Sequence, residues 1–254
     1  MAGADWPGGV ARIVLDTVDS TSREIARRAP DAPTWVLAHA QTEGRGRRGR
    51  GWTVAPGNFA ASLGWRPEVP PAQMALRSFT ASLALHDALA GLGVRDLSLK
   101  WPNDVLLGEG KLAGILLEVP APGLLVVGIG VNLAAAPAPG EIEPGALRPV
   151  SLLAETGVRV APEVFLDRLA PAFAAREAQL VTEGFAATRA DWLRHAARLG
   201  QAIAVRLPTE TLEGTFEDID NDGQLVLGTP RGGRRIAAGD VFFGRVPAEG
   251  ARCS

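Results

Sequence analysis

The chain has 254 residues, a formal charge of −2 and a hydrophobic content of 46%, so it can bury a sizeable core and has no general attraction to nucleic acid. Its length exceeds the roughly 100 to 150 residues of a usual domain, which predicts one large domain and a small one. Its single cysteine, Cys253, excludes an internal disulfide, and the absence of a signal peptide or of an apolar run near the ~20 residues of a membrane span predicts a cytoplasmic protein with no membrane partner.

The first predicted elements are a strand over 10–15 and a short helix that ends at Arg28. Thr21 and Glu24 have the spacing of a capping box, which places the start of this helix at the segment Asp19-Ser-Thr-Ser22. Taken by itself, this spacing is equally compatible with hydroxyl groups that bind a ligand and with hydroxyl groups that only cap the helix.

A second strand, over 34–40, leads into a segment rich in glycine and arginine, Gln41-Thr-Glu-Gly-Arg-Gly-Arg-Arg-Gly-Arg-Gly-Trp52. Its glycines allow the backbone to approach a ligand closely, and its arginines offer planar donors suited to phosphate or carboxylate. Arginines inside the Gly-x-Gly-x-x-Gly spacing, and Pro56 after it, argue against a dinucleotide-binding helix. The segment predicts a loop that closes over an anion; a solvated basic turn and an arginine-rich arm for nucleic acid are the alternatives.

The following patterns predict an α+β fold, with helices packed on a mixed or antiparallel sheet. Apolar residues alternate over 58–65, which is typical of a half-buried strand. The strands predicted over 112–119 and 124–129 form a hairpin. Antiparallel neighbours argue against a doubly wound parallel sheet. The pattern predicts strands over 58–65, 97–101, 112–119 and 124–129, helices over 72–92, 162–183 and 185–199, and an irregular loop over 134–149.

From Gly200 the pattern changes to short β-type segments. Turn signals at Asn221-Asp-Gly223 and Gly232-Gly233 separate them, and Asn-Asp-Gly is a strong hairpin signal. We therefore predict a large domain over 1–199 and a small β-barrel over 200–254. The predicted barrel segments are 202–207, 212–219, 224–227 and 241–246.

Lys100 and Lys111 are the only lysines among 26 basic residues, and both lie within one short segment. A chain that otherwise uses arginine keeps lysine where a compact, rotatable ammonium is needed and a planar guanidinium would not fit. Asn103 and Asp104 lie in the same segment after a Trp-Pro pair, which disfavours helix and sets a stiff turn at the end of a strand. This segment is therefore a second candidate for the functional site.

At these residues the chain resembles the biotin protein ligases. The resemblance implies the class II synthetase-like catalytic fold of biotin and lipoate ligases, followed by a small SH3-like β-barrel. Bifunctional members carry an N-terminal helix-turn-helix module, and only about ten residues precede the first strand here, so we expect the monofunctional type with no nucleic-acid partner. The matching motifs are Asp19-Ser-Thr-Ser22, Gly44-Arg-Gly-Arg-Arg-Gly-Arg50 with Trp52, Lys100-Trp-Pro-Asn-Asp104, Lys111-Leu-Ala-Gly-Ile-Leu-Leu-Glu118 and Gly128-Ile-Gly-Val-Asn132.

The resemblance implies a ligase reaction in two steps. The biotin carboxylate attacks the α-phosphorus of ATP to give biotinyl-5'-AMP and pyrophosphate, and a lysine amine of a biotin carboxyl carrier protein then displaces AMP. The expected substrates are biotin and ATP with Mg²⁺, with neither a tightly bound prosthetic group nor a covalent enzyme intermediate. A monomer and a homodimer are both compatible. Lipoate ligases and octanoyltransferases share the fold, but the arginine loop together with Lys-Trp-Pro-Asn-Asp resembles the biotin group.

The resemblance also assigns roles to individual residues. Hydroxyls and the Gln41 amide can pair with the ureido group of biotin, although Gln41 could also be an ordinary surface glutamine. Ser22 stands where the family usually has Asn. Trp52 is expected to stack on adenine, with a buried core tryptophan as the alternative, and residues 44–52 are expected to be mobile until ligand binds. In full, the expected biotin-binding residues are Ser20, Thr21, Ser22, Gln41, Arg45, Gly46, Arg47 and Lys111; the nucleotide-binding residues are Arg47, Arg48, Trp52, Lys100, Asn103 and Asn132; Lys111 and Arg47 are catalytic; and Asp104 binds Mg²⁺.

Overall fold

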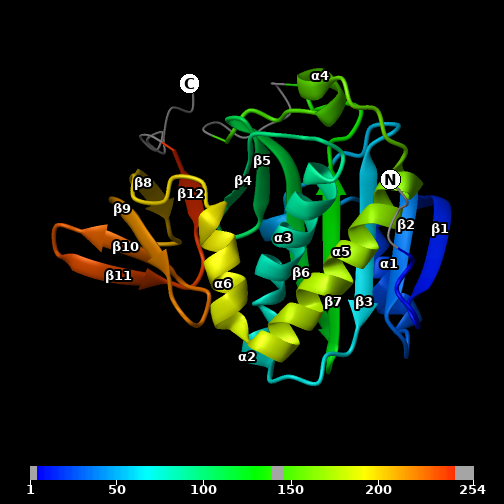
Figure 1. The fold of residues 1–254 in the computed structure, drawn as a ribbon, viewed down its shortest axis with the longest axis horizontal. Helices are drawn as coiled ribbons and strands as arrows, with labels where there is room; N and C mark the ends of the chain where they lie inside the picture. The colour runs from blue at the N-terminus through cyan, green and yellow to red at the C-terminus, as the bar shows by residue number, and fades with distance from the viewer. Residues whose placement is uncertain (1–4, 139–145, 244–254) are drawn as a thin grey trace, which may run out of the picture.

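The computed structural model describes residues 5–138 and 146–243, and it contains two sheets that lie side by side (Figure 1). The larger sheet has the strand order β1-β2-β3-β7-β6-β5-β4; β1 and β2 pair in parallel, and the other neighbours pair antiparallel. The predicted α+β class is therefore confirmed. The strands are β1 (Ala11–Val18), β2 (Thr34–Gln41), β3 (Phe59–Trp65), β4 (Leu97–Lys100), β5 (Asp104–Leu107), β6 (Gly110–Ala121) and β7 (Leu124–Val131).

Helices cover both faces of this sheet. Two helices, α3 and α5, pack over the face that carries Leu37 and Val127, whereas Val36 and Val126 on the opposite face pack against Ile25 of α1. Strand β3 is buried along its whole length because it lies between these two layers, so the prediction of a half-buried strand was wrong. The helices are α1 (Thr21–Arg28), α2 (Pro71–Met74), α3 (Arg77–Ala90), α4 (Leu152–Thr156), α5 (Pro162–Glu183) and α6 (Phe185–Arg194).

Glycines leave part of the α1 face open. Successive side chains of a strand alternate between the two faces, so the even-numbered residues of β7 point toward α1. Val126 packs under Ile25, but the next two even positions are Gly128 and Gly130. Helix α1 begins at Thr21, close to Gly128, and beyond that point these two positions put no side chain on the sheet face.

The smaller sheet packs against the β4 end of the larger one (Figure 1). Trp101 Nε1 donates to the carbonyl of Gly223 at 3.1 Å, and Arg189 forms an ion pair with Asp218. The Gly232-Gly233 pair was predicted as a turn, but it begins β11, a strand that the sequence pattern did not predict. In the order β11-β10-β9-β8-β12, the strands are β8 (Ala202–Arg206), β9 (Thr211–Ile219), β10 (Leu225–Thr229), β11 (Gly232–Ile236) and β12 (Asp240–Phe242).

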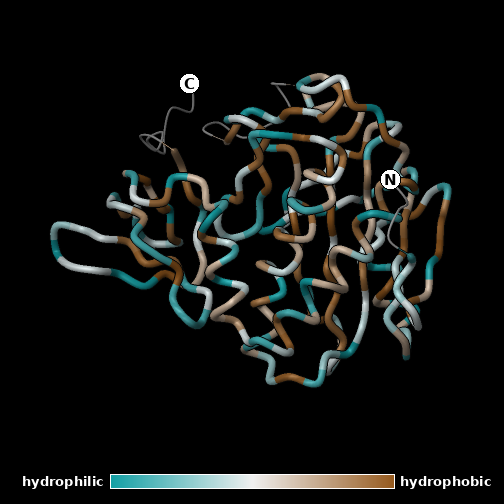
Figure 2. Tube along the Cα trace, viewed as in Figure 1, coloured by the Kyte–Doolittle hydropathy of each residue, from teal (hydrophilic) through white to brown (hydrophobic). Residues whose placement is uncertain are grey.

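Figure 2 shows that the tip of the β10–β11 hairpin is polar, whereas the central strands of the large sheet are hydrophobic. Several helix predictions need correction. The helix predicted over 72–92 is two helices, α2 and α3, and α6 ends at Arg194, short of position 199. The capping box does not form, because the N-cap of α1 is Ser20 and its side chain makes no capping hydrogen bond.

Residues 139–145 of the predicted loop lie outside the described residues. In the described ranges, no helix has the length and apolar character needed to cross a membrane.

Candidate active site

A cavity of about 390 Å³ lies over the glycines of the α1 face. A Cβ atom at Gly130 would lie 2.2 Å from the Trp52 ring, and one at Gly128 would lie 2.8 Å from Ser22 Oγ. The floor of the cavity therefore requires glycine at these two positions, because the side chain of any other residue would collide with Trp52 or Ser22. The predicted site residues that line the cavity are Ser20, Thr21, Ser22, Gln41, Arg45, Gly46, Arg47, Trp52, Lys100, Asn103, Asp104, Lys111 and Asn132.

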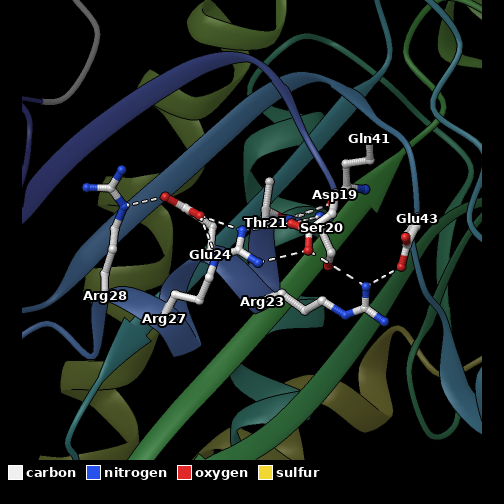
Figure 3. Close-up of polar contacts among 9 residues, drawn as sticks. All are labelled: Asp19, Ser20, Thr21, Arg23, Glu24, Arg27, Arg28, Gln41 and Glu43. Atoms are coloured by element: carbon white, nitrogen blue, oxygen red, sulfur yellow. Dashed lines mark hydrogen bonds and ion pairs between the residues drawn. The ribbon is translucent and has the colours of Figure 1, made fainter.

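Hydroxyl groups gather at one end of the cavity. Gln41 Oε1 accepts hydrogen bonds from the Thr21 backbone N–H at 2.7 Å and from Thr21 Oγ1 at 3.1 Å (Figure 3). Thr21 Oγ1 also lies 2.8 Å from Ser62 Oγ, which lies 3.1 Å from Ser22 Oγ. Ser62 was not among the predicted site residues, because the alternation over 58–65 placed it on the face of the strand that was expected to be exposed, whereas it is buried. These bonds fix the start of α1 against β2 and β3.

Charged side chains brace this end from outside (Figure 3). Asp19 accepts from the Ser20 N–H at 2.7 Å and from both terminal nitrogens of Arg27, at 2.8 and 2.7 Å. The hydrogen bonds from Arg27 hold the pKa of the Asp19 carboxyl well below its usual range. Arg23 pairs with Glu43, at the base of the glycine-arginine segment. Each exposed pair contributes little to stability, but together they hold the start of α1 beside the end of β2.

Two lysines share one buried carboxylate. Lys111 Nζ lies 2.7 Å from Asp104 Oδ1, and Lys100 Nζ lies 3.5 Å from Asp104 Oδ2. Burial alone would raise the pKa of Asp104, but the ammonium groups of Lys111 and Lys100 hold it below its ordinary value. Burial also lowers the pKa of Lys100, against the attraction of Asp104. The antiparallel pairing of β4, β5 and β6 brings the three residues together.

These residues give limited support to a magnesium site made by the protein alone. Mg²⁺ prefers oxygen ligands, and protein sites commonly supply one or two carboxylates while substrate phosphates supply the rest. Asp104 already faces two ammonium groups, and the described residues contain no group of three or more His, Cys, Asp or Glu side chains that could hold a metal. The Asp104 ligand assignment stays a prediction, and the donor set fits magnesium that arrives with phosphate.

The glycine-arginine segment, residues 44–52, folds back over the cavity as a short hairpin-like loop. The Gly46 N–H donates to the carbonyl of Arg50 at 2.7 Å, and the Trp52 N–H donates to the carbonyl of Gly44 at 2.9 Å. Arg47 reaches inward, with Nη1 3.1 Å from Asn103 Oδ1. Burial lowers the pKa of the Arg47 guanidinium, which indicates a cation removed from water that lacks a full anionic partner.

Arg48 is the predicted site residue that the fold does not place on the cavity wall. It adopts a left-handed backbone conformation (φ 56°), and its Nη1 lies 2.6 Å from Asp240 Oδ2 on β12. Arg50 Nη2 lies 2.8 Å from the same oxygen. The assignment of Arg48 to the nucleotide stays a prediction. Sequence reasoning missed the contribution of the smaller sheet, which supplies Arg206, Gly239, Asp240, Val241 and Phe242 to the wall.

Asn132 closes the opposite end of the floor. It is buried, and its Nδ2 donates to the carbonyl of Val150 at 3.1 Å. Within the part of the chain that the structure describes, Asn132 Oδ1 is buried without a hydrogen-bond partner. An unpaired buried acceptor costs about 1–3 kcal/mol, so this oxygen suits a donor group on a ligand.

Comparison with known proteins agrees with this geometry. Residues 14–132 match the Biotin/lipoate A/B protein ligase family, and residues 199–244 match the Biotin protein ligase C terminal domain. These matches, together with a relative that is 52% identical and covered over its whole length, show that the chain belongs to the biotin/lipoate A/B protein ligase family. It is 52% identical over 240 residues to a biotin–acetyl-CoA-carboxylase ligase from Paracoccus denitrificans, with 91% of this chain and 100% of that protein covered.

More distant relatives extend the similarity. A biotin–acetyl-CoA-carboxylase ligase from Mycobacterium tuberculosis is 35% identical over 255 residues, covering 94% of this chain and 90% of that protein. The structure of a biotin protein ligase from Aquifex aeolicus in complex with biotin and ATP has a TM-score of 0.81 at 26% identity, covering 91% of this chain and 97% of that one.

Proposed function

We propose that this protein is an ATP-dependent ligase that activates biotin as biotinyl-5'-AMP and transfers it to a lysine of a biotin carboxyl carrier protein. The observation that carries the proposal is the order of groups along β7. Gly128 lies beside the hydroxyl groups, Gly130 lies beneath Trp52, and Asn132 lies at the far end. Positions two residues apart on a strand are separated by about 6.5–7 Å, so the cavity fits a long substrate with a different group at each end.

The hydroxyl end suits the ureido ring of biotin, because Thr21, Ser22 and Gln41 offer hydrogen-bond donors and acceptors there. The carboxylate then lies near Lys111, beside Trp52, whose ring is 5.9 Å from Lys111 Nζ. Asn132 Oδ1 can accept from the amino group of adenine. This order favours Trp52 as a cover for the acyl chain over the expected adenine stack.

The chemistry follows from placing the two anions together. A carboxylate oxygen of biotin attacks the α-phosphorus, and the bond to pyrophosphate breaks. Lys111 and Arg47 stabilise the charge on the carboxylate and phosphate oxygens, which is the largest contribution that fixed charges make to such reactions. Mg²⁺ enters with the phosphates of ATP and neutralises part of their charge. In the second step the acceptor amine attacks the acyl carbon, and AMP leaves.

Substrate choice is the sharpest test of this proposal. Exchange of radiolabelled pyrophosphate into ATP should require biotin, and lipoate or octanoate should support little exchange. The rival reading, a lipoate or octanoate enzyme of the same fold, gives the opposite ranking. Exchange with none of the three acids would instead favour a phosphate-binding protein without this catalysis.

Several further features belong to the same proposal. The catalytic domain is assigned to 1–199 and the small C-terminal domain to 200–254, which agrees with the C-terminal match at 199–244. We also propose that the protein is cytoplasmic, that it has no prosthetic group, and that it is a monomer or a homodimer.

The ligase is also expected not to bind DNA specifically. A net charge of −2 gives the chain as a whole little electrostatic attraction to the phosphates of DNA. Operator-like duplex DNA should therefore show no sequence-specific shift in a gel at physiological salt. A specific shifted band that survives competitor DNA would contradict the monofunctional reading.

Ligand is expected to slow hydrogen exchange in residues 44–52. In the free protein, Arg45, Arg48 and Arg50 connect this loop to the body through a few ion pairs, whereas the carboxylate and phosphate groups of the ligands are absent. Phosphate and carboxylate add stronger partners. Exchange should be measured by mass spectrometry with and without biotin and ATP, using the buried part of α3, which does not line the cavity, as the unchanged control. Equal exchange in the loop with and without the ligands would contradict the proposal that the loop closes over them as a lid.

A further inference from the structure

Among the described residues, basic side chains outnumber acidic ones on the walls of the cavity. Their basic residues are Arg45, Arg47, Arg50, Lys100, Lys111 and Arg206, whereas their acidic residues are Asp104 and Asp240. Asp104 is engaged by the two lysines. The other carboxylate among the described lining residues is Asp240, which comes from the smaller sheet and pairs with arginines.

Three guanidinium groups converge on one oxygen of Asp240. Oδ2 lies 2.6 Å from Arg48 Nη1, 2.8 Å from Arg50 Nη2 and 3.3 Å from Arg206 Nη2. Arg206 is the register partner of Asp240 on β8, so it holds the carboxylate from within the smaller sheet. Arg48 and Arg50 come from the loop over residues 44–52. Asp240 thus joins the lid to the smaller sheet.

The Asp240 carboxyl is well suited to a permanent negative charge. Its side chain is only 11% exposed, so water screens these contacts less than at an open surface. Burial alone would raise its pKa, but the charges of Arg50 and Arg48 hold the pKa below its ordinary value. The carboxylate therefore stays ionised at neutral pH.

The anions in the cavity change during the proposed reaction. ATP brings several negative charges, which can satisfy the arginines of the loop directly. After pyrophosphate leaves, the acyl-adenylate carries a single negative charge, too little for all the cations around it. Unless another anion holds Arg48 and Arg50, repulsion among the basic side chains opens the loop.

We infer that Asp240 is a positioning residue that keeps the loop closed over biotinyl-AMP between the two half-reactions. Once pyrophosphate has left, it no longer pairs with Arg48 and Arg50, and Asp240 then serves as their anionic partner. This inference rests on the proposed ligase function. It assigns the small C-terminal domain a defined task, namely to supply the anion that retains a reactive intermediate.

The test compares Asp240→Asn with wild type by the escape of preformed, radiolabelled biotinyl-AMP. Loss of charge-assisted bonds should make escape about tenfold faster. The KM for ATP should not rise, because removing a negative charge does not weaken phosphate binding. Asp240→Glu should retain the intermediate better than Asp240→Asn. In the Arg48→Gln, Arg50→Gln background, Asp240→Asn should add little to the escape rate, because its two partners on the loop are already gone and only Arg206 of the smaller sheet remains.

Asp218→Asn is the matched control. Asp218 also lies on the smaller sheet and also pairs with an arginine of the large domain, Arg189, but it does not line the cavity. This variant should retain biotinyl-AMP as wild type does. Equal escape from Asp218→Asn and Asp240→Asn would attribute the effect to general loosening of the smaller sheet and overturn the inference.

Retention in Asp240→Asn that matches wild type would also overturn it. If Asp240→Asn does not fold, Arg48→Gln and Arg50→Gln, separately and together, measure the same contact from the loop side. Wild-type protein that makes no biotinyl-AMP at all would refute the proposed function itself, an outcome that differs from the failure of the Asp240 inference.

Discussion

Lys111→Arg is expected to slow the formation of biotinyl-AMP by ~10²-fold or more, which is the typical loss when one well-placed stabilising donor is removed. The substitution keeps the charge. It changes the geometry, because an ammonium turns its three donors freely, whereas a guanidinium holds its donors in one plane. The result would identify a requirement for lysine itself.

The structure gives this requirement a physical basis. Lys111 Nζ lies 2.7 Å from Asp104 Oδ1, and Lys100 approaches the other oxygen of the same carboxylate. A larger, planar group at position 111 cannot keep this contact and also turn toward the substrate carboxylate. Lys111→Ala should be slower still, because Asp104 then keeps only the more distant ammonium and the substrate loses its partner.

Single-turnover assays with radiolabelled ATP measure this step directly. Arg231→Lys, in the exposed turn between β10 and β11, is a matched control for exchanging the two basic residues, and its rate should equal that of wild type. Near-normal adenylation by both Lys111 variants, with unchanged thermal stability, would reduce Lys111 to an ordinary surface lysine.

Arg47→Gly is expected to release biotinyl-AMP about 10- to 100-fold faster than wild type, since charge-assisted bonds to phosphate contribute about 1.5 to 3 kcal/mol. Arg47 reaches Asn103 at 3.1 Å from inside the loop, and burial lowers the pKa of its guanidinium. Among the residues that the structure describes, its side chain hydrogen-bonds to the neutral Asn103, and a desolvated cation in this position gains most from an arriving phosphate. Arg47 is therefore the strongest arginine candidate for the adenylate.

The same assay separates Arg47 from its neighbour. Arg48→Gly removes a charge too, and glycine accepts the left-handed backbone of that position at no steric cost. It loses only the contact with Asp240, so escape should be slower than from Arg47→Gly. Formation of the adenylate should also suffer in Arg47→Gly and less in Arg48→Gly. Wild-type-like retention by Arg47→Gly would show that another arginine binds the phosphate.

Local patterns were sufficient for much of this molecule. The spacing of apolar residues predicted α5 over its observed range and the hairpin of β6 and β7, because periodicity follows from contacts between near neighbours in the chain. The scarcity of lysine singled out Lys100 and Lys111, which the fold places on one carboxylate. The motifs likewise contain most of the lining that the large domain supplies, but none of the residues that the smaller sheet contributes.

Other features depend on contacts between distant parts of the chain. Arg48 lies 192 residues from Asp240, and no local pattern predicts that the two meet at the cavity rim or that Arg48 leaves its wall. The position of Trp52 over Gly114 and Gly130 likewise depends on how the loop folds onto two strands. The sequence by itself determined which chemical groups and elements this protein contains. Only the tertiary structure decided which charges face each other, because burial and ion pairing are set by packing between segments far apart in the chain.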